Sequence, residues 1–141
     1  ALHKPDKNDP IDVLSKVGGF DLCAMTGVFL GAAAERIPVV VDGFISIVAA
    51  LCASRLSPNA KAYFLGSHRS FEIGYRLADT ELGLHPCLEL GMRLGEGSGC
   101  PIAFRVVEAA CAVISTMATF PEAAIDDEYL TDIRAKDSFT V

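Results

Sequence analysis

One short run of sequence decides the fold class: Ile37-Pro38-Val39-Val40-Val41-Asp42-Gly43, which is rich in β-branched residues and ends abruptly in an acid and a glycine. Because the run is apolar on both sides, it predicts a buried parallel strand rather than an exposed antiparallel one. A helix is predicted over residues 45–56, directly after it. The run therefore predicts a strand, a short polar loop and a covering helix.

The same order recurs twice further along the chain. A second strand is predicted over residues 62–65, followed by the polar segment Ser67-His68-Arg69-Ser70 and a helix over residues 71–82. A third strand, over residues 87–90, leads into a glycine-rich loop and an apolar helix over residues 101–118, which we expect to be deeply packed. Repeated strand, loop and helix units predict an α/β fold with a parallel, Rossmann-like sheet covered by helices.

The glycine-rich loop is Gly91-Met92-Arg93-Leu94-Gly95-Glu96-Gly97-Ser98-Gly99-Cys100. Its glycines allow positive φ angles and let a small molecule approach the backbone closely. Glu96 stands between two glycines, so its carboxylate is open to whatever enters the loop. Composition alone leaves the alternative of an ordinary turn with a solvated glutamate.

Ligands bind at the carboxyl ends of strands in parallel sheets, so we expect the three polar loops to share one edge. Ser70 is predicted as the N-cap of its helix, where the free N–H groups of the first turn suit a phosphate; the alternative is that Ser70 only caps. Two roles stay open for Asp42, which are to accept a hydrogen bond from a ribose hydroxyl or to cap the helix near Ile45. His68 and Arg69 are more typical of surface or supporting groups than of ligands.

The glycine-rich loop matches neither of the common nucleotide-binding patterns. It lacks the G-x-G-x-x-G order of dinucleotide sites and the lysine of the P-loop. Both patterns depend on glycines at fixed offsets from a helix start. Dinucleotide and ATP sites are therefore not predicted.

Composition and charge exclude several classes of partner. The chain has 141 residues, 51% of them hydrophobic, which is one domain's length and enough to bury a core. The net charge is −6 and the 12 Lys and Arg residues are scattered, which argues against nucleic acid. The longest uncharged apolar runs, residues 22–34 and 44–54, are shorter than the roughly 18 to 20 residues that span a bilayer. We predict no nucleic-acid and no membrane partner.

The cysteine pattern indicates a reducing compartment. The five cysteines form no C-x-x-C pair and no cluster at zinc-ligand spacing: Cys23, Cys52, Cys87, Cys100 and Cys111. An odd count in mainly apolar surroundings is typical of reduced, buried thiols. We predict a cytoplasmic protein without metal or cofactor, and the polar N-terminus predicts no signal peptide.

The chain divides into three parts by composition. Residues 1–9 form a polar lead-in, residues 10–125 form the α/β part, and residues 126–141 form an acidic peripheral tail with a helix near 128–135. Within the α/β part, helices are predicted over residues 11–17 and 21–35, before the first strand. The start at Ala1 without an initiator methionine suggests a piece of a longer protein.

Four blocks of the sequence, in order, resemble the C-terminal part of nicotinate-nucleotide:dimethylbenzimidazole phosphoribosyltransferases. They are Lys16-Val17-Gly18-Gly19-Phe20-Asp21, Arg36-Ile37-Pro38-Val39-Val40-Val41-Asp42-Gly43-Phe44-Ile45, Ser67-His68-Arg69-Ser70 and Gly91-Met92-Arg93-Leu94-Gly95-Glu96-Gly97-Ser98-Gly99. The resemblance covers about residues 9–125. It implies the C-terminal part of a larger three-layer α/β domain and, since family members are more than twice this length, a missing N-terminal half.

The resemblance also implies a function and a set of site residues. It implies a glycosyltransferase that moves phosphoribose from nicotinate mononucleotide to 5,6-dimethylbenzimidazole, or a related base, in cobalamin assembly, and that acts as a homodimer. Glu96 is implied as the general base. Substrate contacts are implied for five residues: Asp42, Gly43, Ser70, Leu94 and Gly95. The alternative is a truncated, non-catalytic nucleotide-binding or partner-binding module of the same fold.

Overall fold

The computed structural model describes residues 2–125 and residue 131. The chain forms two compact units, Ala1–Val106 and Val107–Val141. The helix predicted near residues 128–135 lies, apart from residue 131, outside the described residues. The three-part division by composition stays a prediction.

Two helices precede the first strand. Helix α1 (Pro10–Val17) begins with its proline in the first turn, and the Asp9 side chain accepts hydrogen bonds from the backbone N–H groups of Ile11 and Asp12. Asp9 is therefore the N-cap, and it satisfies donors that a helix start leaves unpaired. Helix α2 (Phe20–Ala34) follows and is apolar almost all round.

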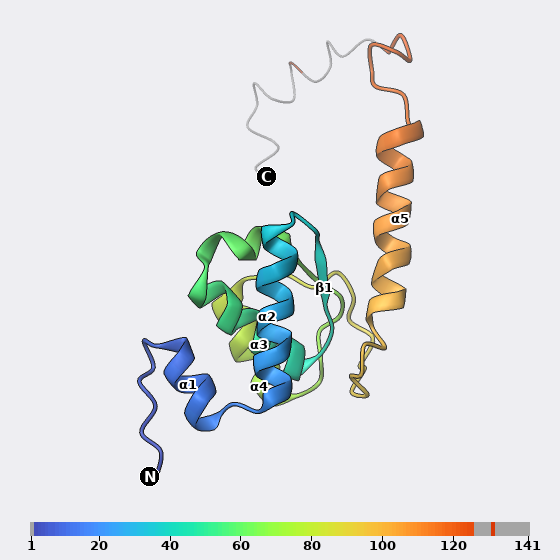
Figure 1. The fold of residues 1–141 in the computed structure, drawn as a ribbon. Helices are drawn as coiled ribbons and strands as arrows, with labels where there is room; N and C mark the ends of the chain where they lie inside the picture. Colours follow the sequence, from blue (N-terminus) through green and yellow to red (C-terminus); the bar gives the residue numbers. More distant parts are fainter. Residues whose placement is uncertain (1, 126–130, 132–141) are drawn as a thin grey trace. The chain divides into compact units, whose positions relative to one another are not determined.

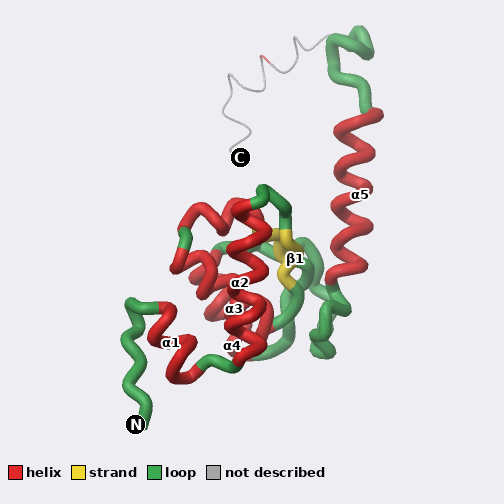
Figure 2. Tube along the Cα trace, viewed as in Figure 1, coloured by secondary structure: helices red, strands yellow, loops and turns green. Residues whose placement is uncertain are grey.

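The sheet consists of two parallel strands joined through a helix. Strand β1 (Val39–Val41) pairs with β2 (Phe64–Gly66), with Val39 opposite Phe64 and Val41 opposite Gly66. Helix α3 (Phe44–Leu56) and the 3₁₀ helix η1 (Pro58–Tyr63) make the connection between them. The predicted parallel α/β arrangement is confirmed, although helices outweigh strands (Figure 2).

The prediction of a third strand over residues 87–90 is wrong. The segment forms one isolated parallel bridge, between His68 and Leu88. Glu89 and Leu90 are both exposed, so the run does not have the two buried faces that a central parallel strand requires. The segment still runs beside the end of β2, and it leads into the glycine-rich loop.

The core of the first unit lies between α2, α3 and α4 (Ile73–Leu82), which lie together in Figure 1. Three alanines of α3, Ala49, Ala50 and Ala53, are fully buried, and their small side chains let neighbouring helices approach closely. The rings of Phe29 and Phe64 meet edge to face at 5.0 Å, which joins α2 to β2. None of the helices in the described part of the chain has both the length and the apolar character needed to cross a membrane.

Helix α5 (Cys100–Thr116) is packed less than the sequence predicts. Of its described residues only Ala103 is buried, whereas Ile114 is 84% exposed. An apolar helix is buried only where another element covers it, and composition does not supply that element.

After the helix, the Glu122 carboxylate accepts hydrogen bonds from the backbone N–H and hydroxyl of Thr119, which lower the pKa of Glu122.

Candidate functional site

The ends of β1 and β2 meet at one edge of the sheet, as the parallel order predicts. The backbone N–H of Ser67, just after β2, donates to the carbonyl of Val41 at 2.9 Å. Asp42 and Gly43 follow β1 and lead directly into α3. The polar residues that follow each strand therefore lie side by side.

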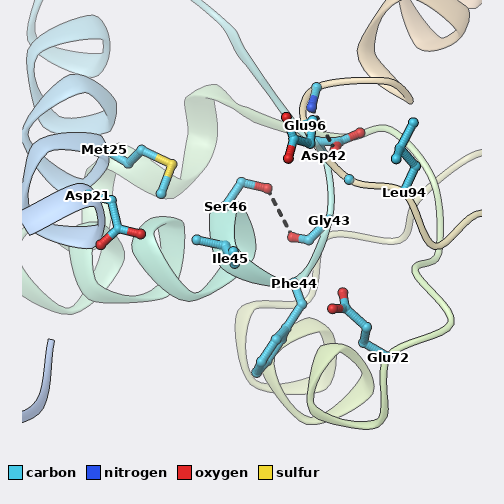
Figure 3. A pocket seen from close by; sticks show the side chains of 12 residues that line it. Asp21, Met25, Asp42, Gly43, Phe44, Ile45, Ser46, Glu72, Leu94 and Glu96 are labelled. Carbon is cyan, nitrogen blue, oxygen red and sulfur yellow. Dashed lines mark hydrogen bonds between the residues drawn. The ribbon is translucent and has the colours of Figure 1, made fainter. Parts of the chain in front are cut away.

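A cleft of about 570 Å³ opens at this edge (Figure 3). Helix α2 contributes Asp21 and Met25, and Glu72 lies near the opposite wall. Five of the six predicted site residues line the cleft: Asp42, Gly43, Leu94, Gly95 and Glu96. The sixth, Ser70, is not part of the lining. The structure thus brings most of the predicted site together from segments more than 50 positions apart.

The glycine-rich loop has the backbone that its composition predicts. Gly95, Glu96 and Gly97 are consecutive and have φ angles of 72°, 57° and 77°. This left-handed region favours glycine, and a residue with a side chain occupies it at a cost of about 1 kcal/mol or more. Glu96 therefore holds a strained conformation, and its carboxylate is exposed at the cleft.

Asp42 does not have the capping role that was left open for it. The N-cap residue of α3 is Gly43. The Asp42 oxygens instead accept hydrogen bonds from the backbone N–H groups of Gly97 (3.0 Å) and Gly99 (2.8 Å). Sequence reasoning missed this contact, since nothing in the spacing pairs an acid with amides 55 and 57 positions away.

Of the two roles expected for His68, at the surface or in support of the site, the structure excludes the surface role. The side chain is fully buried, and its Nε2 lies 3.3 Å from Oδ1 of Asp42. The ring packs against Gly99, so this histidine lies beneath the glycine-rich loop. Its neighbour Arg69 is exposed, as expected, and the Arg69 N–H donates to the Leu88 carbonyl at 2.8 Å.

Two groups near Asp42, the half-buried Cys100 and the fully buried Tyr75, have raised pKa values. Burial, followed by the Asp42 charge, raises the pKa of the Cys100 thiol. Burial, followed by the Asp79 carboxylate, raises the pKa of Tyr75. Both effects indicate a poorly solvated environment beneath the cleft.

The prediction of buried thiols is wrong for three cysteines, Cys23, Cys87 and Cys111, which are exposed. Apolar neighbours along the sequence do not fix which face of an element a side chain occupies. All five cysteines are free thiols.

The predicted N-cap role of Ser70 is also wrong. Helix α4 begins later than predicted, and its N-cap residue is Glu72. The buried Ser70 hydroxyl donates to Oε2 of Glu72 at 3.0 Å. Phe71, between them, donates its N–H to the Met92 carbonyl at 3.2 Å, which fixes this segment against the glycine-rich loop. Glu72 has an extended backbone, so the helix starts only at Ile73.

This arrangement can bind a small molecule and accept a proton from it. One carboxylate is exposed on glycine-flanked backbone, and a second is buried and fully hydrogen-bonded beside it. Within the described ranges, no three His, Cys, Asp or Glu side chains lie close enough together to hold a metal ion. The fold and the site define an α/β protein with a small-molecule cleft at the carboxyl ends of parallel strands.

Comparison with known proteins gives the family. A family model described as phosphoribosyltransferase matches residues 1–125. The nicotinate-nucleotide–dimethylbenzimidazole phosphoribosyltransferase of Clostridium perfringens is 60% identical over 139 residues, which cover 99% of this chain and 38% of that protein. The enzyme of the same name from Clostridium tetani is 50% identical over 136 residues, which cover 96% of this chain and 38% of that protein. This chain belongs to that phosphoribosyltransferase family.

The solved structures agree with this assignment. The crystal structure of nicotinate-nucleotide–dimethylbenzimidazole phosphoribosyltransferase from Thermus thermophilus superposes with a TM-score of 0.82 at 34% sequence identity. The match covers 89% of this chain and 38% of that one. The chain therefore spans well under half the length of the relatives that it matches.

Proposed function

We propose that the protein containing this chain transfers the phosphoribosyl group of nicotinate mononucleotide to 5,6-dimethylbenzimidazole or a related lower-ligand base. The products are α-ribazole 5′-phosphate and nicotinate, in the assembly of the cobalamin nucleotide loop. The observation that carries the proposal is the exposed, glycine-flanked Glu96 on the cleft of a chain whose relatives are named for this reaction. A cytoplasmic setting is part of the proposal.

The chemistry needs one proton acceptor. One ring nitrogen of the benzimidazole forms a bond to C1′ of the ribose while the bond from C1′ to the pyridinium nitrogen breaks. The bonding electron pair goes to that nitrogen, so nicotinate leaves without acid assistance. The other benzimidazole nitrogen loses its proton, and Glu96 accepts it as the general base.

The cleft suits this step because its general base, Glu96, stands between two glycines, which carry no side chains that could solvate it. Glycines on both sides of Glu96 leave its carboxylate accessible from the cleft. The backbone of Gly95 and the Leu94 side chain offer an apolar surface for a planar aromatic base. Gly43 lies at the start of α3, where backbone N–H groups suit the oxygens of the ribose phosphate.

We further propose that residues outside this chain complete the cleft and that the enzyme is a homodimer. Leu94 lines the cleft yet is 76% exposed, so more protein is needed to enclose an aromatic substrate. On α2, added side chains at Gly27 and Gly31 would meet nothing within 4 Å, and Val28 beside them is 63% exposed. A flat apolar helix face of this kind suits close packing with another helix.

Substitution of Glu96 tests the proposed reaction. In the intact protein, Glu96→Gln is expected to lower kcat by about 10²- to 10⁴-fold, because the side-chain shape is kept and the proton acceptor is lost. Nicotinate release from nicotinate mononucleotide and dimethylbenzimidazole measures the effect. Glu81→Gln on α4, which loses an exposed carboxylate paired with Arg55, is the matched control and should keep the parent rate. Parent-like turnover by Glu96→Gln across neutral pH would exclude Glu96 as the base.

Phosphate binding by Ser70 is a separate part of the proposal. The Ser70 hydroxyl would have to leave Glu72 in order to reach a phosphate oxygen. We expect Ser70→Ala to weaken nicotinate mononucleotide by about 1 kcal/mol more than nicotinate riboside, which lacks the phosphate. Calorimetric titration with both ligands measures the difference. Equal losses for the two ligands would place Ser70 away from the phosphate.

A further inference from the structure

Asp42 connects β1 to the loop that carries the proposed base. Its side chain is 6% exposed, and each oxygen accepts one backbone N–H: Oδ2 from Gly97 at 3.0 Å and Oδ1 from Gly99 at 2.8 Å. Hydrogen bonds to an ionised carboxylate are roughly twice as strong as neutral ones. The two amides lie one and three positions after Glu96, so the carboxylate grips the loop immediately beyond the base.

The loop needs such an attachment because its backbone is strained. Three consecutive residues, Gly95 to Gly97, have left-handed φ angles, and the middle one carries a side chain. Turns within the loop supply two bonds, Ser98 N–H to the Gly95 carbonyl and Cys100 N–H to the Gly97 carbonyl. These local bonds shape the loop but do not attach it to the sheet. Asp42 attaches Gly97 and Gly99 to the end of β1, next to a longer contact of 3.7 Å between the Cys100 thiol and the Val40 carbonyl of β1.

His68 packs beneath the glycine-rich loop, beside Asp42. Its ring lies so close beneath the loop that a Cβ at Gly99 would come within 2.2 Å of His68 Cδ2 and 2.7 Å of Asp42 Oδ1. No real side chain tolerates such contacts, so position 99 requires glycine. The Asp42 carboxylate is thus enclosed by two amides and an imidazole whose Nε2 is 3.3 Å away.

We propose that Asp42 is a positioning residue that acts through Glu96, instead of contacting ribose. It fixes the strained loop so that the base carboxylate stays directed at the cleft. This inference rests on the proposed function, because it assigns Asp42 a part in placing the base for the transfer. In this proposal, the buried Asp42 and His68 support the loop that carries the exposed Glu96.

A kinetic cycle in the intact protein separates positioning from substrate contact. Asp42→Asn keeps one acceptor oxygen but turns an amide group toward the other N–H, so kcat is expected to fall by about 10- to 100-fold. The KM for nicotinate mononucleotide should change by less than about threefold, because the substrate contacts remain. Asp12→Asn, which alters a partly exposed aspartate on α1 that also accepts a backbone N–H, is the matched control and should behave like the parent.

The double variant gives the decisive readout. If Asp42 acts through Glu96, then Asp42→Asn combined with Glu96→Gln turns over at the rate of Glu96→Gln alone, since no base remains to be positioned. A ribose contact, or general damage to the fold, would instead multiply the two losses. Multiplied losses, or a defect mainly in KM, would overturn the proposal.

Amide hydrogen exchange tests the support without relying on activity. In Asp42→Asn, exchange at Gly97 and Gly99 should be at least about tenfold faster than in the parent, while core amides of α3 stay protected. Gly99→Ala, which unseats the loop sterically and keeps the Asp42 charge, should give the same pattern. Unchanged exchange at these amides in both variants would overturn the inference. If the parent releases no nicotinate, the proposed function fails, and the exchange result still decides whether Asp42 holds the loop.

Discussion

Asp42 and Glu96 are two carboxylates that belong to one cleft and have opposite environments. Asp42 follows a buried strand, is almost completely enclosed and uses both oxygens in hydrogen bonds to backbone. Glu96 is exposed, stands between glycines and holds a left-handed backbone angle. One acid is fixed by its surroundings, and the other is kept available.

The contrast assigns stability to one carboxylate of the cleft and chemistry to the other. A buried carboxylate with every oxygen bonded stabilises the fold and has little capacity left for a reaction. An exposed carboxylate on strained backbone contributes little to stability and remains free to accept a proton. We therefore expect substitution of Asp42 to lower stability more than substitution of Glu96, and substitution of Glu96 to lower turnover more than substitution of Asp42.

The largest expected effect on stability is at Asp42. Asp42→Ala should lower the free energy of unfolding by about 2 to 4 kcal/mol, since it leaves the amides of Gly97 and Gly99 buried without an acceptor. Glu96→Ala should change it by less than about 0.5 kcal/mol, as is usual for an exposed position. Urea denaturation of the intact protein measures both values. Similar losses for the two variants would break the contrast.

A smaller effect of opposite sign is expected when the strain at Glu96 is released. Glu96→Gly removes the side chain from a left-handed position, which should raise the free energy of unfolding by up to about 1 kcal/mol. The same variant should lose nicotinate release, because the base is gone. Comparison with Glu96→Ala, which keeps the strain, isolates the backbone term by denaturant titration. A glycine variant less stable than the alanine variant would show that the loop is not strained.

The smallest expected effect concerns the thiol beside Asp42. Burial and then the Asp42 charge raise the pKa of Cys100, so the thiol stays protonated at neutral pH and reacts slowly. Asp42→Asn removes one of these causes, which lowers the pKa and should speed alkylation by iodoacetamide about two- to threefold near pH 8. Peptide mass spectrometry follows Cys100, with the exposed Cys23 on α2 as the internal control. An unchanged rate at Cys100 would contradict a charge effect from Asp42.

Local patterns in the sequence predicted the elements of the fold well. The β-branched run before Asp42 and the glycines around Glu96 produced the strand and the positive φ angles that were expected. Both signals act within a few residues, where sterics and hydrogen bonding decide the conformation. The strand over residues 87–90 failed because its sheet pairing depends on distant neighbours, which a local pattern does not contain.

The sequence predicted five residues that line the cleft, but it did not predict the contacts between them. The five predicted residues that line the cleft were found from strand-end logic and family resemblance. The bonds of Asp42 to the loop and the burial of His68 depend on which surfaces meet in three dimensions. The Ser70 cap failed because Glu72 has an extended backbone and Phe71 is bonded to Met92, so α4 starts two residues later than predicted.

The link from Asp42 to Gly97 joins positions 55 apart in the chain. Closing a flexible loop of that length costs about 3.5 kcal/mol of chain entropy, which falls once the intervening helices and strand have formed. The contact should therefore be made late in folding, after β1, α3, β2 and α4 are in place. During synthesis, Asp42 also leaves the ribosome long before its partners do. The proposed base is therefore positioned only in molecules that have already folded. We expect incomplete or locally unfolded chains to be inactive.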